Sequence, residues 1–93
     1  MPLYEKIGDL LGKANCLQSL GDILKAEGDM PGAVEHWQAA LELYGRINDR
    51  YSAGWTLRRL ALAGEGEARR QYLEQARAAW RDMPYLLENL DLE

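Results

Sequence analysis

The chain has 93 residues, of which 47% are hydrophobic, and a formal net charge of -4, so we expect one domain with a modest core. Cys16 is the only cysteine, which excludes an internal disulfide and fits a reducing compartment. The acidic balance and the lack of a long basic run argue against nucleic acid as a partner. Residues 1–6 lack the features of a signal peptide, and no stretch is long enough to span a membrane. We therefore expect a cytoplasmic protein without a membrane partner.

The first helix is expected to begin after Asp9, a suitable N-cap, and to run to about Glu27. Residues 3–9 are similar to residues 43–49, 40 positions later, so we interpret residues 3–7 as the remnant of a preceding repeat. The apolar face of the first helix comprises Ala14, Leu17, Leu20, Gly21 and Leu24. A glycine within a helix costs about 0.5–1 kcal/mol relative to alanine, so Gly21 predicts close approach of a partner helix.

A sharp break follows the first helix. Gly28 can end that helix, Asp29 can cap the next one, and Pro31 suits a first helical turn. The second helix is expected over about Met30 to Arg46, with an apolar face of Met30, Ala33, Trp37, Ala40, Leu41 and Tyr44. The two helices predict a hairpin that buries Trp37 and Tyr44.

A second hairpin is expected over residues 49–83. Asn48 and Asp49 turn the chain and cap a third helix, which ends at residues 64–66 and has an apolar face of Ala53, Leu57, Leu60 and Ala61. A fourth helix begins near Glu67, with an apolar face of Tyr72, Leu73, Ala76, Ala79, Trp80 and Met83. Matching positions lie 40 residues apart in the first and third helices and 36 apart in the second and fourth. The second unit is therefore about four residues short, as terminal repeats often are.

Residues 84–93 begin with a proline and place Leu86, Leu87 and Leu90 on one side of one or two helical turns. We interpret this segment as a cap over the fourth helix, because a stack of repeats must cover its last face. The alternative is a segment that docks into another copy of the chain.

The order of residues over 14–47 resembles the tetratricopeptide repeat. Leu17, Leu20-Gly21, Gly28-Asp29, Ala33, Trp37, Ala40 and Tyr44 follow its 34-residue frame. Leu24 replaces the usual aromatic residue, and Gly45 stands where the family often has proline. The resemblance implies an all-α domain over residues 1–93, in which a first repeat (9–47) and a shortened second repeat (49–83) stack as antiparallel hairpins.

In tetratricopeptide repeats the first helix of each hairpin lines a concave face whose polar positions contact peptides. Carried over to this sequence, those positions are Asn15, Gln18, Asp22, Lys25, Trp55, Arg58 and Leu62, with Arg59 adjacent. The family's carboxylate clamp uses Lys and Asn where this chain has Gln18 and Asp22, so that clamp is not implied here. Asp22 can neutralise one of the two arginines and leave the other to engage an acidic peptide; the alternative for both arginines is a solvated helix face.

The resemblance thus implies a scaffold or interaction module that binds a protein or peptide. Self-association, as a homodimer or a longer stack, is the alternative function, because Leu10, Leu11 and Leu17 have only residues 3–7 beside them. Trp37 and Trp80 are expected in the core. Trp55 lies off the apolar face of its helix and is either an interface anchor or a cover for the junction with the first two helices.

We do not expect an enzyme. His36 is the only histidine, and no residue at a recognisable spacing would orient it against Cys16, which we expect to be partly buried as a small apolar residue. One histidine and one cysteine are too few for a metal site. The glycines at 28 and at 64–66 mark turns and not a phosphate loop, so no cofactor is expected.

Overall fold

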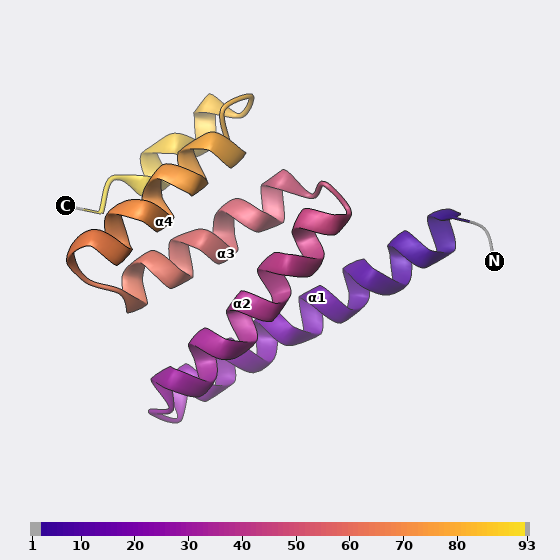
Figure 1. Cartoon of the computed structure of the whole chain (residues 1–93), viewed down its shortest axis with the longest axis horizontal. Coiled ribbons are helices and arrows are strands. Elements are labelled where there is room, and N and C mark those ends of the chain that lie inside the picture. Colours follow the sequence, from indigo (N-terminus) through magenta and orange to yellow (C-terminus); the bar gives the residue numbers. More distant parts are fainter. Residues whose placement is uncertain (1–2, 93) are drawn as a thin grey trace.

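Four helices in two consecutive antiparallel pairs make up the fold (Figure 1). The computed structural model describes residues 3–92, with side chains from Lys6 onward. The helices are α1 (Leu3–Ala26), α2 (Met30–Arg46), α3 (Arg50–Ala63) and α4 (Gly66–Ala79), followed by a short 3-10 helix, η1 (Pro84–Leu90). The all-α prediction is confirmed. Over the described residues, no helix combines the length and the apolar character that crossing a membrane requires.

The turns α1–α2 and α2–α3 have the same construction. At the first, Gly28 has a φ of +89° and the amide of Asp29 donates to the carbonyl of Leu24. At the second, Asn48 has a φ of +56° and the amide of Asp49 donates to the carbonyl of Tyr44. Both are Schellman endings, which require a residue that tolerates positive φ.

The aspartate of each turn then caps the next helix. The side chain of Asp29 accepts a 2.9 Å hydrogen bond from the amide of Gly32, and that of Asp49 accepts a 3.0 Å bond from the amide of Ser52. Both carboxylates therefore satisfy amides that the first turn of a helix leaves without partners. The predicted turn and caps are confirmed at both places.

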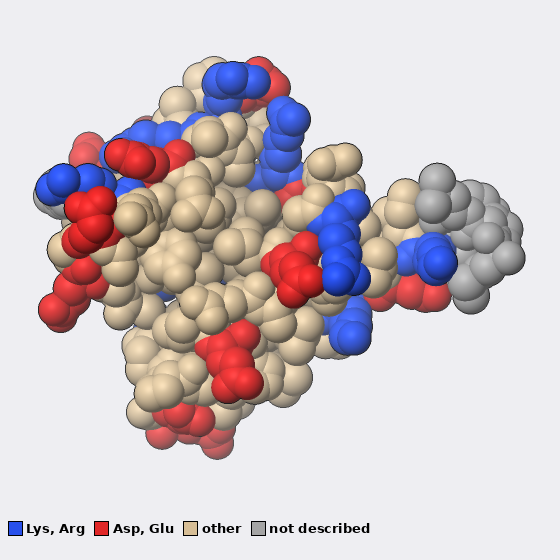
Figure 2. Space-filling view, in the orientation of Figure 1, with Lys and Arg blue, Asp and Glu red and all other residues tan. Residues whose placement is uncertain are grey.

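The start of the first helix was predicted wrongly. Helix α1 is continuous from Leu3, so Asp9 lies within it and caps nothing. The intervening Gly8 costs only about 0.5–1 kcal/mol relative to alanine, and no proline interrupts the helix after it. With 24 residues against 17 in α2, the N-terminal part of α1 projects beyond the body of the molecule (Figures 1 and 2).

The first hairpin packs through one small residue and one aromatic residue at each of two levels. Gly21 on α1 lies against Trp37 on α2, so close that an added Cβ would be 2.5 Å from the indole. Two turns earlier on α1, Ala14 packs with Tyr44 near the other end of α2. Trp37 and Tyr44 are fully buried, as predicted, and Gly21 does allow close approach of α2.

The second hairpin also places a small residue of α3 against α4 at two levels, but its partner is aromatic at only one of them. Gly54 on α3 lies against the indole of Trp80, and Ala61 shares a cluster with Leu73 on α4. Helix α4 ends at Ala79, earlier than the predicted Met83, and Trp80 takes the C-cap position. Its indole nevertheless remains completely buried.

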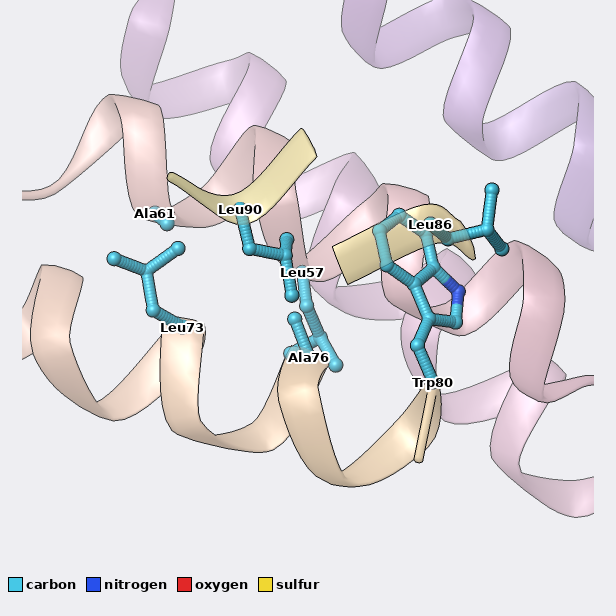
Figure 3. Packing of buried hydrophobic residues seen from close by; sticks show 7 residues of the cluster. All are labelled: Leu57, Ala61, Leu73, Ala76, Trp80, Leu86 and Leu90. Carbon is cyan, nitrogen blue, oxygen red and sulfur yellow. The ribbon is translucent and has the colours of Figure 1, made fainter. Parts of the chain in front are cut away.

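Helix η1 closes this end of the molecule. Figure 3 shows the cluster that it completes, in which Leu86 and Leu90 reach the side chains of Leu57, Ala61, Leu73, Ala76 and Trp80. Leu86 and Leu90 are buried and Leu87 is half-buried. The interpretation of residues 84–90 as a cap over α4 therefore agrees with the observed packing.

Helix α3 joins the hairpins by packing on α2. Leu60 is buried against Ala33 and Trp37. The predicted apolar faces are otherwise correct except at two large residues: Leu20 is 47% exposed and Met30 is 36% exposed. Leu20 lies outside the buried clusters of the first hairpin and lines a shallow depression formed by residues of α1.

Candidate functional site

A groove of about 410 Å³ runs between α1 and α3. Asp22 and Lys25 line it from α1, Trp37 from α2, and the remaining lining residues come from α3. Those residues are Trp55, Arg58, Arg59 and Leu62. Six of the eight residues predicted for partner binding thus meet in one groove. Trp37, which was assigned only to the core, is an additional lining residue.

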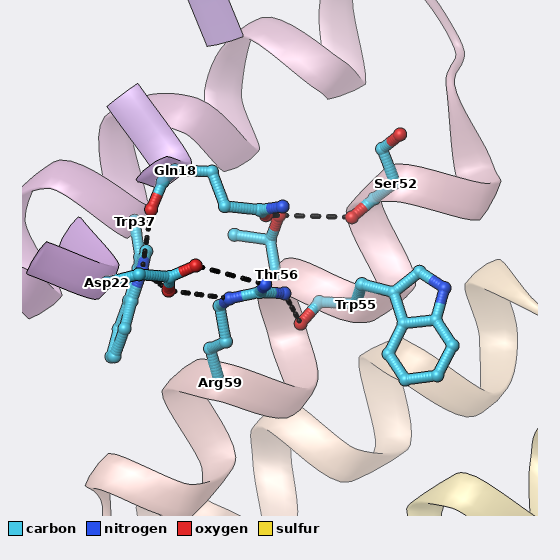
Figure 4. A network of polar contacts seen from close by, with 7 residues as sticks. All are labelled: Gln18, Asp22, Trp37, Ser52, Trp55, Thr56 and Arg59. Carbon is cyan, nitrogen blue, oxygen red and sulfur yellow. Dashed lines mark hydrogen bonds and ion pairs between the residues drawn. The ribbon is translucent and has the colours of Figure 1, made fainter. Parts of the chain in front are cut away.

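An ion pair ties the two walls of the groove together. Arg59 donates to both carboxylate oxygens of Asp22, with its Nε at 2.9 Å and a terminal nitrogen at 3.2 Å (Figure 4). The same guanidinium donates to the carbonyl of Trp55 at 3.2 Å. Two parallel hydrogen bonds hold a carboxylate in a defined orientation. Of the two arginines, Arg59 is therefore the one that Asp22 neutralises.

The indole of Trp37, on α2, is also part of this network. Its Nε1 donates to Asp22 at 3.1 Å and to the carbonyl of Gln18 at 3.3 Å. A buried indole N–H needs such an acceptor, and this requirement is the only sequence signal that could have linked Trp37 to the groove. The side chain of Trp37 therefore belongs both to the core and to the wall of the groove.

Gln18 and Asn15 do not line the groove. The side-chain oxygen of Gln18 accepts a hydrogen bond from the hydroxyl of Thr56, which is fully buried and also donates to the carbonyl of Ser52 at 3.0 Å. Gln18 thus connects α1 to α3 beneath the groove. Asn15 accepts a hydrogen bond from the hydroxyl of Tyr44, at the junction with α2.

The environment of that hydroxyl affects its acidity. Burial raises the pKa of Tyr44 above the usual value for tyrosine, and the nearby carboxylate of Asp49 raises it further. The positive charge of Arg59 and a hydrogen bond with Ser52 oppose this shift but do not cancel it. Tyr44 therefore stays neutral over the physiological pH range.

Lys25 and Arg58 supply the remaining positive charge of the groove. Arg58 donates from Nε to the carbonyl of Asn89 on η1 at 2.8 Å, a contact that the sequence did not predict. Within residues 6–92, neither the terminal nitrogens of Arg58 nor the ammonium of Lys25 has a carboxylate partner. Leu62, which is 40% exposed, adds an apolar surface beside them.

Trp55 packs within the second hairpin, and its role as an interface anchor stays a prediction. Its ring packs edge-to-face on Trp80, with centroids 4.8 Å apart, and also meets the ring of Tyr51 at 6.3 Å. It covers the end of the second hairpin and not the junction with α1 or α2. In Figure 4 its ring points away from Arg59, so only part of this half-buried residue faces the groove.

Cys16 and His36 lie apart from the groove. Cys16 is exposed on α1, which contradicts the prediction of partial burial, because helical spacing places it away from Ala14 and Gly21, which pack on α2. Nδ1 of His36 lies 2.8 Å from the carbonyl of Gly32, one turn back on α2. Within the described part of the chain, no three His, Cys, Asp or Glu side chains converge as metal ligands would.

Comparisons with protein-family models, with curated proteins and with solved structures find no match to this chain. The structure accordingly describes an all-helical domain of four helices packed as two antiparallel hairpins, with a polar and cationic groove between the first helices of the two pairs.

Proposed function

We propose that this domain is a protein-interaction module of the tetratricopeptide-repeat type, which binds an acidic peptide segment in the groove between α1 and α3. The observation that carries the proposal is the convergence, in one groove, of six of the eight residues that the resemblance selected. Those six residues come from α1 and α3, and the residues of one helix are 30 to 40 positions from those of the other. Random surface positions on two helices would not face one another in this way.

The repeated contacts support the assignment to this type of fold. Gly54 and Trp80 occupy the places of Ala14 and Tyr44, at separations of 40 and 36 residues. The pair Ala61 and Leu73 likewise takes the places of Gly21 and Trp37. Two hairpins that pack through corresponding positions and stack through α2 and α3 are the architecture of helical repeat proteins.

The chemistry of the groove favours an acidic partner. Lys25, Arg58 and Arg59 bring three positive charges, and the single carboxylate of Asp22 is already paired with Arg59. A carboxylate of the partner can therefore bind the terminal nitrogens of Arg58, whose planar group suits two parallel hydrogen bonds. Leu62 and the exposed edge of Trp55 provide the contact surface for an aliphatic or aromatic side chain next to that carboxylate.

Selection from a random displayed-peptide library, followed by binding measurements, tests this function. We expect selected peptides to be acidic and to bind more weakly as salt increases, because dissolved ions screen the attraction between opposite charges. Arg58→Ala should weaken binding about tenfold, since a hydrogen bond to a charged group contributes about 1.5 kcal/mol or more. Arg81→Ala, an exposed arginine outside the groove, is the matched control. Equal affinity of the parent and Arg58→Ala at low salt would show that Arg58 does not bind the peptide. Its role would then be limited to its contact with η1 and to a solvent-exposed face of α3.

A further inference from the structure

The guanidinium of Arg59 lines the groove but already holds a carboxylate. Its Nε and a terminal nitrogen donate to the two oxygens of Asp22, at 2.9 and 3.2 Å (Figure 4). Two parallel hydrogen bonds of this kind are also how arginine binds the carboxylate of another chain. The structure therefore shows which chemical group the Arg59 site accepts, because a carboxylate of the chain itself occupies it.

The neighbouring Arg58 is held differently. Its Nε donates to the carbonyl of Asn89 at 2.8 Å, so its terminal nitrogens remain for a carboxylate of a partner. Within residues 6–92, no carboxylate is paired with Arg58. The groove thus contains two arginines, of which one is open to a partner and the other is filled by Asp22.

The contacts around Asp22 allow its carboxylate to be displaced. The side chains of Arg59 and Asp22 are 30% and 44% exposed, so a carboxylate can reach Arg59 from solvent while that of Asp22 turns towards water. The indole of Trp37 donates to Asp22 at 3.1 Å and also to the carbonyl of Gln18 at 3.3 Å. Its N–H group therefore keeps an acceptor when Asp22 turns away.

We propose that Arg59 is a second carboxylate-binding site of the groove, and that Asp22 restricts this site as an internal competitor. This inference rests on the proposed binding of an acidic peptide in the groove. One carboxylate of the peptide binds Arg58, whereas a carboxylate that binds Arg59 must first displace Asp22. The charge of Asp22 therefore limits the affinity for segments that bring an acidic residue to each arginine.

Asp22→Asn tests the competition. The amide keeps an oxygen for the indole of Trp37 but removes the charge that makes the hydrogen bonds to Arg59 strong. We expect peptides selected from the displayed library on Asp22→Asn to carry one more acidic residue than those selected on the parent. These peptides should bind the variant about tenfold more tightly than they bind the parent, since a hydrogen bond to a charged group is gained.

Asp29→Asn is the matched control. It changes the net charge by the same amount, lies outside the groove, and replaces one good N-cap residue by another. It should not show the gain in affinity. Circular dichroism verifies that both variants keep their helices.

The gain must also depend on Arg59. The double variant Asp22→Asn with Arg59→Gln should lose it. In NMR spectra of the arginine side chains, the Nε–H signal of Arg59 should shift when the peptide is added to Asp22→Asn.

The outcomes separate this inference from the proposed function. If Arg58→Ala weakens peptide binding but Asp22→Asn gains no more affinity than Asp29→Asn, the binding groove stands and the second site is refuted. A gain that persists in the double variant would also refute the second site, because it would arise from the lost negative charge and not from Arg59. If neither the parent nor Asp22→Asn selects acidic peptides, the proposed function fails and this inference fails with it.

Discussion

The contact between Gly21 and Trp37 makes a sharp prediction about stability. A Cβ at position 21 would lie 2.5 Å from Cδ1 and Nε1 of Trp37 and 3.1 Å from the carbonyl oxygen of Ala33. Non-bonded carbon atoms normally approach to about 3.5–4.0 Å, so the indole would have to move by about 1 Å. The ring is 1% exposed and donates two hydrogen bonds, to Asp22 and to the Gln18 carbonyl, and both would be distorted.

Gly21→Ala should therefore destabilise the domain in spite of its better helix propensity. Overpacking a core costs about 1–3 kcal/mol, and alanine recovers about 0.5–1 kcal/mol. The expected net loss is about 1–2 kcal/mol, which lowers Tm by roughly 5–10 °C in a domain of this size. Gly12→Ala on the same helix meets no atom within 4 Å and should raise stability by about 0.5–1 kcal/mol.

Thermal and chemical unfolding followed by far-ultraviolet circular dichroism would measure both variants. The reasoning requires changes of opposite sign within one helix. If Gly21→Ala stabilises the domain as much as Gly12→Ala does, the indole does not pack on Gly21, and the assigned register of α1 against α2 is refuted.

Two further predictions concern the aromatic residues of the first hairpin. Trp37→Ala should cost about 3–5 kcal/mol, as for other large core aromatics, and a variant with the melting temperature of the parent would contradict its burial. For Tyr44, the folded-state pKa is raised above the unfolded value of about 10, so its contribution to stability is fully present below that pH and is lost as the pH rises towards the folded pKa. Tyr44→Phe should be less stable than the parent at neutral pH, because Asn15 loses its donor. The difference in the free energy of unfolding between the parent and Tyr44→Phe, measured by urea titration, should shrink above pH 10. A constant difference at all pH values would argue against the raised pKa of Tyr44.

The sequence was informative where local chemistry decides the structure. Gly28 with Asp29, and Asn48 with Asp49, specify an ending and a cap within a few residues, so the helix boundaries around both turns were predictable. Gly21 indicated close helix packing because a glycine within a helix requires compensation. No such local signal marks the start of α1, where Asp9 is compatible with both a cap and a helix interior.

The groove was predictable only in part. Helical spacing places Asp22 and Lys25 on one side of α1, and Arg58, Arg59 and Leu62 close together on α3, but it does not say which groups pair. The contact from Arg58 to the carbonyl of Asn89 depends on where η1 folds back. Every residue has a backbone carbonyl, so the sequence does not indicate which one accepts this hydrogen bond. Leu20 was included in the apolar face of the first helix because helical periodicity identifies such a face without showing whether a neighbour covers all of it.

Mapping a selected acidic peptide onto the protein by NMR tests the proposed binding groove most directly. Titrating the peptide should shift the backbone amide signals of Asp22, Lys25, Arg58 and Leu62 together, with the same dissociation constant, and should shift the indole signal of Trp55. Signals of Cys16 and Ile23, which are exposed on α1 but do not line the groove, should stay unchanged. Shifts that gather around Cys16 and Ile23, or on the exposed side of α2 and α4, with the groove signals unmoved, would show that the partner binds elsewhere.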